Sequence, residues 1–252
     1  MALYEELKGR NIIDAIKPLL QNGVLDVRHS DGKIIPLDLK HTWQTPWLHH
    51  RSSYRHNCFI WKDIIFENVV KQVLPQNLWF VPSSCMDCYK VVVRPKNLRQ
   101  LFQLAEVQYA LDHASKCGVE TRKTVFGMYG GYFYNRGLDE GKECYEKVRK
   151  AVDGHIGKDI KVLLKRSCTE MEHGIGPSDK WQITPAQEQF ECLIESKFAM
   201  DIPVLAQQPH LKEHVKMLWI EEAYKLGDET VWEYIDGPLY PEYVTYHDEE
   251  TP

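Results

Sequence analysis

Two cysteines, Cys85 and Cys88, stand three positions apart directly before an apolar run. A C-x₂-C turn presents two thiolates at a spacing that lets both bind one tetrahedral zinc ion. Two further ligands are needed to complete such a site. We expect Cys117 to be the third, and either His113, four residues before it, or Cys168 to be the fourth. The cysteine pattern therefore predicts a mainly structural zinc site.

Paired cysteines also occur in iron–sulfur proteins and in redox enzymes. Bacterial ferredoxin spacing needs a third cysteine where this chain has Val91, so no sequence motif supports an iron–sulfur cluster. A thioredoxin-like pair begins a helix, where the helix dipole stabilises the thiolate, whereas residues 89–94 are β-branched and predict a strand. Free cysteines can also be small buried hydrophobes without chemistry. Zinc is the leading interpretation among these.

Three groups able to transfer protons, Glu170, Glu172 and His173, lie in residues 165–181, after a predicted strand. Loops at strand ends carry many catalytic groups. If the extended backbone continued, Glu170 and Glu172 would share one face, where paired carboxylates act as a general base or hold a divalent cation. We predict that these three residues are catalytic. The alternative is an ordinary exposed polar loop.

Positive charge is concentrated in the middle of the chain. Residues 89–166 hold 16 Lys and Arg against 9 Asp and Glu, whereas residues 167–252 hold 5 against 18. Cations bind phosphates and aromatic rings stack on bases, so a basic, ring-bearing segment is typical of nucleotide and nucleic-acid binding. The alternative is that the basic and acidic regions pack against each other. The predicted ligand-binding residues are Arg94, Arg136, Arg166, Tyr132 and Tyr134.

The elements that must position these side chains follow from the spacing of apolar residues. A strand at 89–94, a helix at 98–114, a hairpin turning at Gly130-Gly131, a helix at 138–152 and a strand at 160–164 are expected. This order predicts an α+β protein with a central antiparallel or mixed sheet of ferredoxin-like β-α-β-β-α-β pattern. A three-layer α/β sheet gives nearly the same order.

The flanking regions complete a three-part organisation. Residues 1–80 predict a helix, a hairpin and a second helix that pack onto the core, with a loop at 41–57. Residues 81–181 form the predicted core. Residues 182–252 predict a helical, acidic C-terminal third, in which Thr184 caps one helix and Gly227 ends another.

The 252-residue chain has no signal-peptide pattern, no apolar run long enough for a membrane span and an odd number of cysteines, seven. These features predict a cytoplasmic protein with reduced thiols and no membrane partner. The expected function is that of a transferase acting on a nucleotide or nucleic acid, with zinc shaping a basic pocket. The alternatives are a non-catalytic adaptor that uses the acidic C-terminal third, and an iron–sulfur or thiol redox protein.

Overall fold

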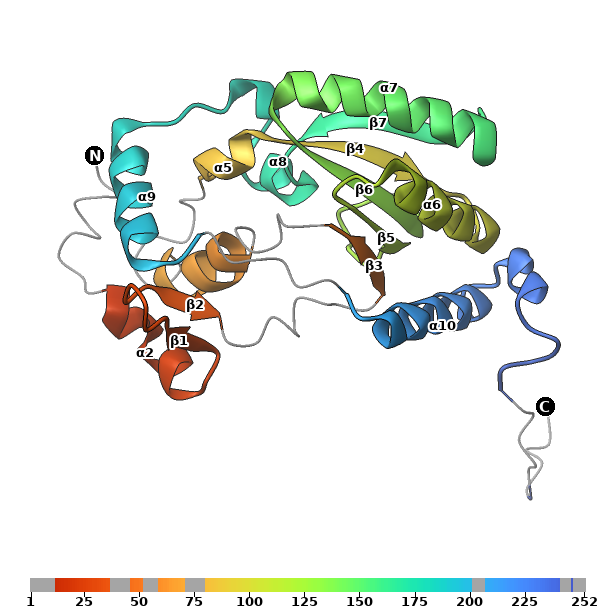
Figure 1. The fold of residues 1–252 in the computed structure, drawn as a ribbon, viewed down its shortest axis with the longest axis horizontal. Coiled ribbons are helices and arrows are strands. Elements are labelled where there is room, and N and C mark those ends of the chain that lie inside the picture. Colours follow the sequence, from red (N-terminus) through yellow and green to blue (C-terminus); the bar gives the residue numbers. More distant parts are fainter. Residues whose placement is uncertain are drawn as a thin grey trace, which may run out of the picture.

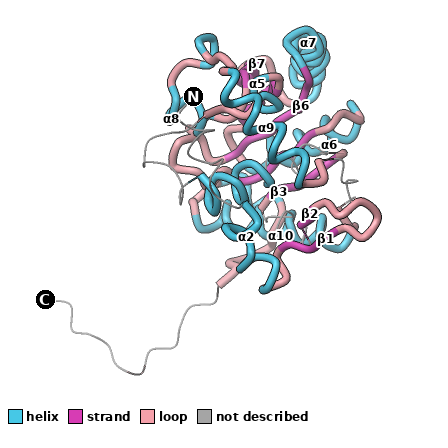
Figure 2. Tube along the Cα trace, turned by 90° about the vertical axis from the view of Figure 1, so that its left-hand side faces the viewer, coloured by secondary structure: helices cyan, strands magenta, loops and turns pink. Residues whose placement is uncertain are grey.

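The computed structural model describes residues 12–36, 46–51, 59–70, 80–200, 207–240 and 246. An antiparallel sheet of five strands, in the order β3-β5-β6-β4-β7, forms the centre of the described chain. A separate two-stranded sheet lies nearer the N-terminus (Figures 1 and 2). The central strands are β3 (Trp47–His50), β4 (Cys88–Arg94), β5 (Ser115–Val119), β6 (Tyr129–Arg136) and β7 (Lys161–Arg166).

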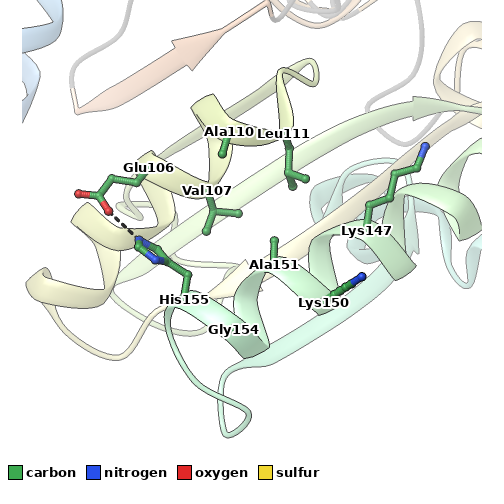
Figure 3. A pocket seen from close by; sticks show the side chains of 9 residues that line it. All are labelled: Glu106, Val107, Ala110, Leu111, Lys147, Lys150, Ala151, Gly154 and His155. Atoms are coloured by element: carbon green, nitrogen blue, oxygen red, sulfur yellow. Dashed lines mark hydrogen bonds and ion pairs between the residues drawn. The ribbon is translucent and has the colours of Figure 1, made fainter.

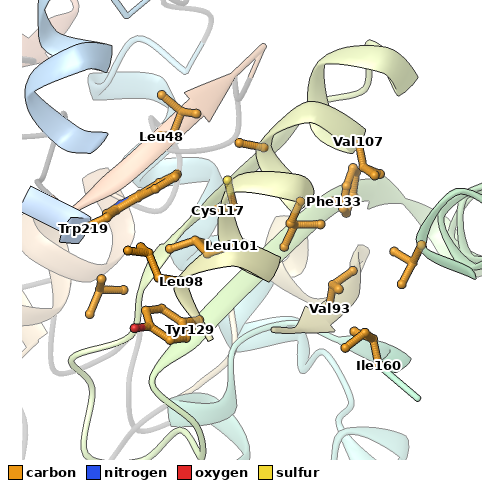
Figure 4. Close-up of a cluster of buried hydrophobic side chains, with 14 of the residues drawn as sticks. Leu48, Val93, Leu98, Leu101, Val107, Cys117, Tyr129, Phe133, Ile160 and Trp219 are labelled. Atoms are coloured by element: carbon orange, nitrogen blue, oxygen red, sulfur yellow. The ribbon is translucent and has the colours of Figure 1, made fainter. Parts of the chain in front are cut away.

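One face of the central sheet is covered by two long helices, α6 (Leu98–Leu111) and α7 (Gly137–His155) (Figure 1). The side chain of Asn97 caps α6 by accepting a hydrogen bond from the backbone N–H of Gln100 at 3.0 Å. Apolar residues of both helices pack on alternate residues of the strands. The resulting cluster includes Leu98, Leu101, Leu104, Val148 and Val152 with Val91, Val93 and Phe133, and Figure 4 shows part of it.

The opposite face of the sheet carries polar side chains, because successive residues of a strand point to opposite sides. Along β4, Val91 and Val93 join the helix-side cluster, whereas Lys90 and Arg94 contact rings on the other side. A short helix, α8 (Thr169–Ile175), lies against this polar side directly after β7. We call this side of the sheet the α8 face.

A second hydrophobic cluster lies beside the sheet. It is formed mainly by α2 (Ile12–Gln21), the hairpin of β1 (Leu25–Val27) and β2 (Ile34–Pro36), the π-helix η2 (Phe59–Val70), α5 (Ser83–Met86) and α9 (Pro185–Lys197). The helix α10 (Pro209–Lys225) packs instead with the sheet and α6, followed by the 3-10 helix η4 (Glu229–Glu233). The two helices of the C-terminal third therefore join different clusters.

Besides its apolar contacts, the acidic C-terminal third is attached to the rest of the protein by carboxylates. Asp228 accepts hydrogen bonds from the backbone N–H of Leu98 and from the Tyr129 hydroxyl, each at 2.7 Å. Glu233 forms an ion pair with Arg99 of α6. These contacts fit the interpretation that the acidic and basic regions pack against each other.

The structure confirms the α+β class and the antiparallel sheet, and it corrects three local predictions. Residues 47–50, expected in a loop, form β3, because they pair with β5 at the sheet edge. Gly130 and Gly131 lie inside β6 rather than at a turn. A Cβ on Gly131 would come within 2.5 Å of Leu104, so this glycine lets α6 approach the strand. Residues 169–175, expected in a loop, form α8.

In the parts of the chain that the structure describes, we find no helix with the length and hydrophobicity that a membrane span requires.

Candidate functional site

The α8 face is centred on Tyr132 of β6, whose ring is contacted by three cations. The guanidinium carbon of Arg94 lies 5.5 Å from the ring centroid, that of Arg122 5.6 Å and the Lys116 ammonium 5.6 Å. Trp47 of β3 packs on the same ring at 5.6 Å between centroids and holds Lys116 over its own ring at 4.1 Å. This arrangement combines cation–π attraction with burial of the aromatic rings.

A charged network lies around the Tyr132 hydroxyl. Tyr132 donates to Glu120 Oε2 at 2.6 Å and accepts from Arg122 Nη2 at 2.9 Å and Arg94 Nη1 at 3.1 Å. Arg122 also pairs with both oxygens of Glu120, through Nε at 2.8 Å and Nη2 at 2.6 Å. Its Nη1 reaches Glu170 of α8 at 2.9 Å. Arg122 therefore joins the sheet to α8.

Burial and opposite charges set the protonation of this network. Burial alone would raise the pKa of Glu120, but the hydrogen bonds from Arg122 and Tyr132 outweigh it, so the pKa is lowered. Burial likewise acts to raise the pKa of Glu170, whereas Arg122 and Lys62 lower it to about 2. The pKa of Tyr132 is raised to about 12, chiefly by burial. At neutral pH both carboxylates are ionised and the phenol is protonated.

The depressed pKa of Glu170 predicts a dependence of stability on pH. The pKa of Glu170 in the folded protein, about 2, lies below the ordinary value of 4.5. The ionised carboxylate therefore contributes fully to the free energy of unfolding above pH 4.5, and this contribution is lost as the pH falls toward 2. Replacing Glu170 with glutamine should cost about 2 kcal/mol at pH 7 and progressively less below pH 4.5. Urea unfolding of both proteins from pH 7 to pH 2.5 measures this, and a constant difference would contradict the assignment.

Cys168 and Lys90 meet at the end of the α8 face where α8 begins. Cys168 is the residue before α8, and its sulfur accepts a hydrogen bond from Lys90 Nζ at 2.9 Å. Lys90 is 8% exposed, and its ammonium also lies 5.6 Å from the ring of Tyr134. This contact places a thiol within hydrogen-bond distance of an almost fully buried ammonium.

The predicted catalytic residues do not act as a pair of carboxylates. In the helix α8, residues two positions apart point in different directions. Glu170 binds Arg122, whereas Glu172 binds Lys165 at 2.7 Å and Ser178 at 2.8 Å. His173 is exposed in the last turn of α8. The prediction that Glu170 and Glu172 share a face is wrong because it assumed extended backbone.

The three predicted phosphate-binding arginines lie in different places. Arg166 pairs with Tyr89 in the register of β7 and β4, on the helix side, and its guanidinium donates to the carbonyls of Met86 and Ser178. Arg136 is opposite Cys88. Arg94 is six residues along β4 from Cys88, so Arg94 and Arg136 stand about 20 Å apart. Only Arg94 of the three contacts Tyr132.

The two predicted stacking residues, Tyr132 and Tyr134, do lie on the α8 face, but they are buried. They are 6% and 7% exposed, and other protein side chains cover their rings. They position cations rather than offering open ring faces to a base.

The five predicted zinc ligands are not gathered into one site. Cys85 lies in the cluster of α2, η2 and α9, Cys88 in a small cluster on the α8 face, and Cys117 in the helix-side cluster (Figure 4). Burial strongly raises the pKa of the Cys117 thiol. The imidazole of His113 hydrogen-bonds to the Tyr134 carbonyl at 2.8 Å.

A common zinc ion is therefore not supported by these positions. The face alternation of β5 places Cys117 on the helix side of the sheet, away from the α8 face where Cys88 lies. Within the described ranges, no three histidine, cysteine or acidic side chains form a group that could hold a metal ion. Cys168 packs against the same cluster as Cys85, but Cys117 lies in the helix-side cluster, so these positions do not support an iron–sulfur site shared by Cys85, Cys88, Cys117 and Cys168.

Sequence reasoning missed Glu120 and Lys90 as members of the site, and it counted Arg122 among the basic residues that flank the strands without selecting it as a ligand-binding residue. Arg122 belongs to a basic run, TRK at 121–123, directly after β5. This position could have indicated a role in the site, because loops that follow a strand often carry functional residues. The contact between Lys90 and Cys168 spans 78 residues and had no sequence signal.

Comparison of the chain with protein-family models, with curated proteins and with solved structures found no match.

Proposed function

We propose that this protein binds a nucleotide or nucleic acid at the α8 face, with Arg94 and Arg122 as the anion-binding groups. The observation that carries the proposal is the state of Arg94. Its half-buried guanidinium is held beside Tyr132, and among the described residues it has no carboxylate partner. A fixed guanidinium without a carboxylate is suited to bind a phosphate.

Glu170 supports a ligand that carries hydrogen-bond donors as well as phosphate. Its Oε1 accepts hydrogen bonds from Arg122 and Lys62, whereas its Oε2 is buried and has no hydrogen-bond partner in the described part of the chain. An unpartnered buried carboxylate oxygen is costly. An amino or hydroxyl group of a nucleotide would satisfy it while Arg94 bound the phosphate.

Group transfer remains a prediction, and the structure changes which residues we assign to it. Glu170 and Glu172 are held ionised in ion pairs, which does not favour general acid catalysis near neutral pH. The contact between Cys168 and Lys90 favours a thiol nucleophile at the same face. In this proposal the Cys168 sulfur would form a bond to the transferred group while the bond between that group and the donor's phosphate breaks. The thiol proton would pass to solvent, and the arginines would hold the departing phosphate.

We also propose that residues 88–166 adopt the ferredoxin-like arrangement. Along the chain the elements follow the order β4-α6-β5-β6-α7-β7, and in the sheet the strands lie in the order β5-β6-β4-β7. Both orders support this assignment. In such a fold the face of the sheet opposite the two long helices can carry a site, and the α8 face is that side of the sheet.

Replacing Arg94 with alanine tests the proposed function. We expect binding of fluorescent single-stranded oligonucleotides or labelled ATP to weaken by about tenfold or more, because a charge-assisted contact to phosphate is lost. The slope of log affinity against log salt should fall by about 1. Fluorescence anisotropy at several salt concentrations measures both.

The matched control is Lys142→Ala, which removes one positive charge from an exposed position of α7 on the other side of the sheet. It should change the affinity by less than about twofold, since an exposed charge away from the site contributes little to binding. If wild type binds neither probe, or if the two variants weaken binding equally, the α8 face is not the binding site.

A further inference from the structure

A groove with a volume of about 540 Å³ runs between α6 and α7 on the side that faces away from the sheet (Figure 3). This volume lies in the range of small-molecule sites, roughly 300–1,000 Å³. The walls are apolar, from Val107, Ala110 and Leu111 on α6 and Ala151 on α7. It is separate from the α8 face, because the sheet and both helices lie between them.

Gly154 makes the groove wider than the fold requires. Its backbone does not have a positive φ, and a Cβ added to it would meet no atom within 4 Å. Neither backbone geometry nor close packing therefore demands glycine here. Glycine within a helix costs up to about 1 kcal/mol relative to alanine. Gly154 is exposed in the last turn of α7 and leaves this end of the groove open.

The rim of the groove is positively charged on its α7 side. Lys147 and Lys150 are exposed, and neither has a carboxylate partner among the residues that the structure describes. At one end, the imidazole of His155 on α7 hydrogen-bonds to the carboxylate of Glu106 on α6 at 2.6 Å (Figure 3). The lysines thus offer two cations beside an apolar floor.

We propose that this groove binds an amphipathic carboxylate with an unbranched apolar chain. From Lys147 to His155 the helix rises about 12 Å, the extended length of a chain of roughly ten carbons. Each methylene removed from water contributes about 0.8 kcal/mol. The chain lies on Val107, Leu111 and Ala151, and the carboxylate pairs with the ammonium groups of Lys147 and Lys150.

Titration calorimetry with sodium decanoate, on the full chain, tests the proposal. Gly154→Leu should abolish binding because the side chain fills the groove, yet it should melt at the same temperature as wild type or higher. Lys147→Gln with Lys150→Gln should weaken binding about three- to tenfold. The control pair is Lys158→Gln with Lys161→Gln, which are exposed outside the groove and should change nothing.

Two ligand controls decide whether the groove selects its charge. Decylamine, of equal chain length and opposite charge, should bind at least tenfold more weakly than decanoate. Equal binding of the two amphiphiles, or decanoate binding that survives Gly154→Leu, would overturn the proposal. Self-association of the wild type that Gly154→Leu removes would assign the groove to a second copy of the chain and would also overturn it.

Discussion

Replacing Glu120 with glutamine is expected to lower the free energy of unfolding by about 3 kcal/mol. The Glu120 side chain is fully buried and binds Arg122 through both carboxylate oxygens and the Tyr132 hydroxyl through one. An amide keeps the shape but removes the charge and one acceptor. The partly buried Arg122 then loses its ion pair with Glu120. Removing one partner of such a pair costs more free energy than the intact pair contributes.

Urea unfolding at pH 7 measures this change. The matched control is Glu213→Gln, an exposed carboxylate paired with Lys216 on α10, which should shift the free energy of unfolding by less than about 0.5 kcal/mol. A single variant as stable as the Glu213 control would show that the network does not hold the sheet and α8 together.

Replacing Gly118 with alanine should be at least as damaging, at about 3–4 kcal/mol. A Cβ on Gly118 would lie 2.1 Å from the carbonyl oxygen of Pro46, which is backbone and cannot rotate away. The same oxygen accepts a hydrogen bond from Trp219 Nε1 at 2.6 Å. The added methyl must therefore displace β3 from β5 and disturb the attachment of α10 to the sheet edge.

Gly154→Ala is the matched control for this prediction, because it makes the same chemical change where a Cβ meets no neighbour. It should leave stability unchanged or raise it by up to about 1 kcal/mol. Thermal unfolding followed by circular dichroism compares the two variants with wild type. Equal melting temperatures for Gly118→Ala and wild type would mean that β3 is not fixed at the position described.

Much of the central fold was predictable because it depends on local patterns. The β-branched run at 89–94, the Asn97 cap and the apolar spacing of 98–111 each specify their own element. The helices at 185–197 and 209–225 were predicted for the same reason. The strand β3 was missed because its four residues carry no period of their own and become a strand only by pairing with β5.

The candidate site was predictable only as a set of residue types. Arg94, Tyr132, Tyr134, Cys168 and Glu170 were selected from the sequence and do lie on the α8 face. Arg166 was selected on the same grounds and lies on the other side of the sheet, since one step along a strand reverses the direction of a side chain.

What the sequence determined by itself is the order of the central elements, their α+β class and the concentration of positive charge between residues 89 and 166. The tertiary structure alone decided which side chains meet. Strand register places Cys117 and Cys88 on opposite faces, and α8 carries Glu170 to Arg122 across 48 residues. Periodicity is local and can be read along the chain, whereas contacts between distant segments depend on how the sheet and helices pack.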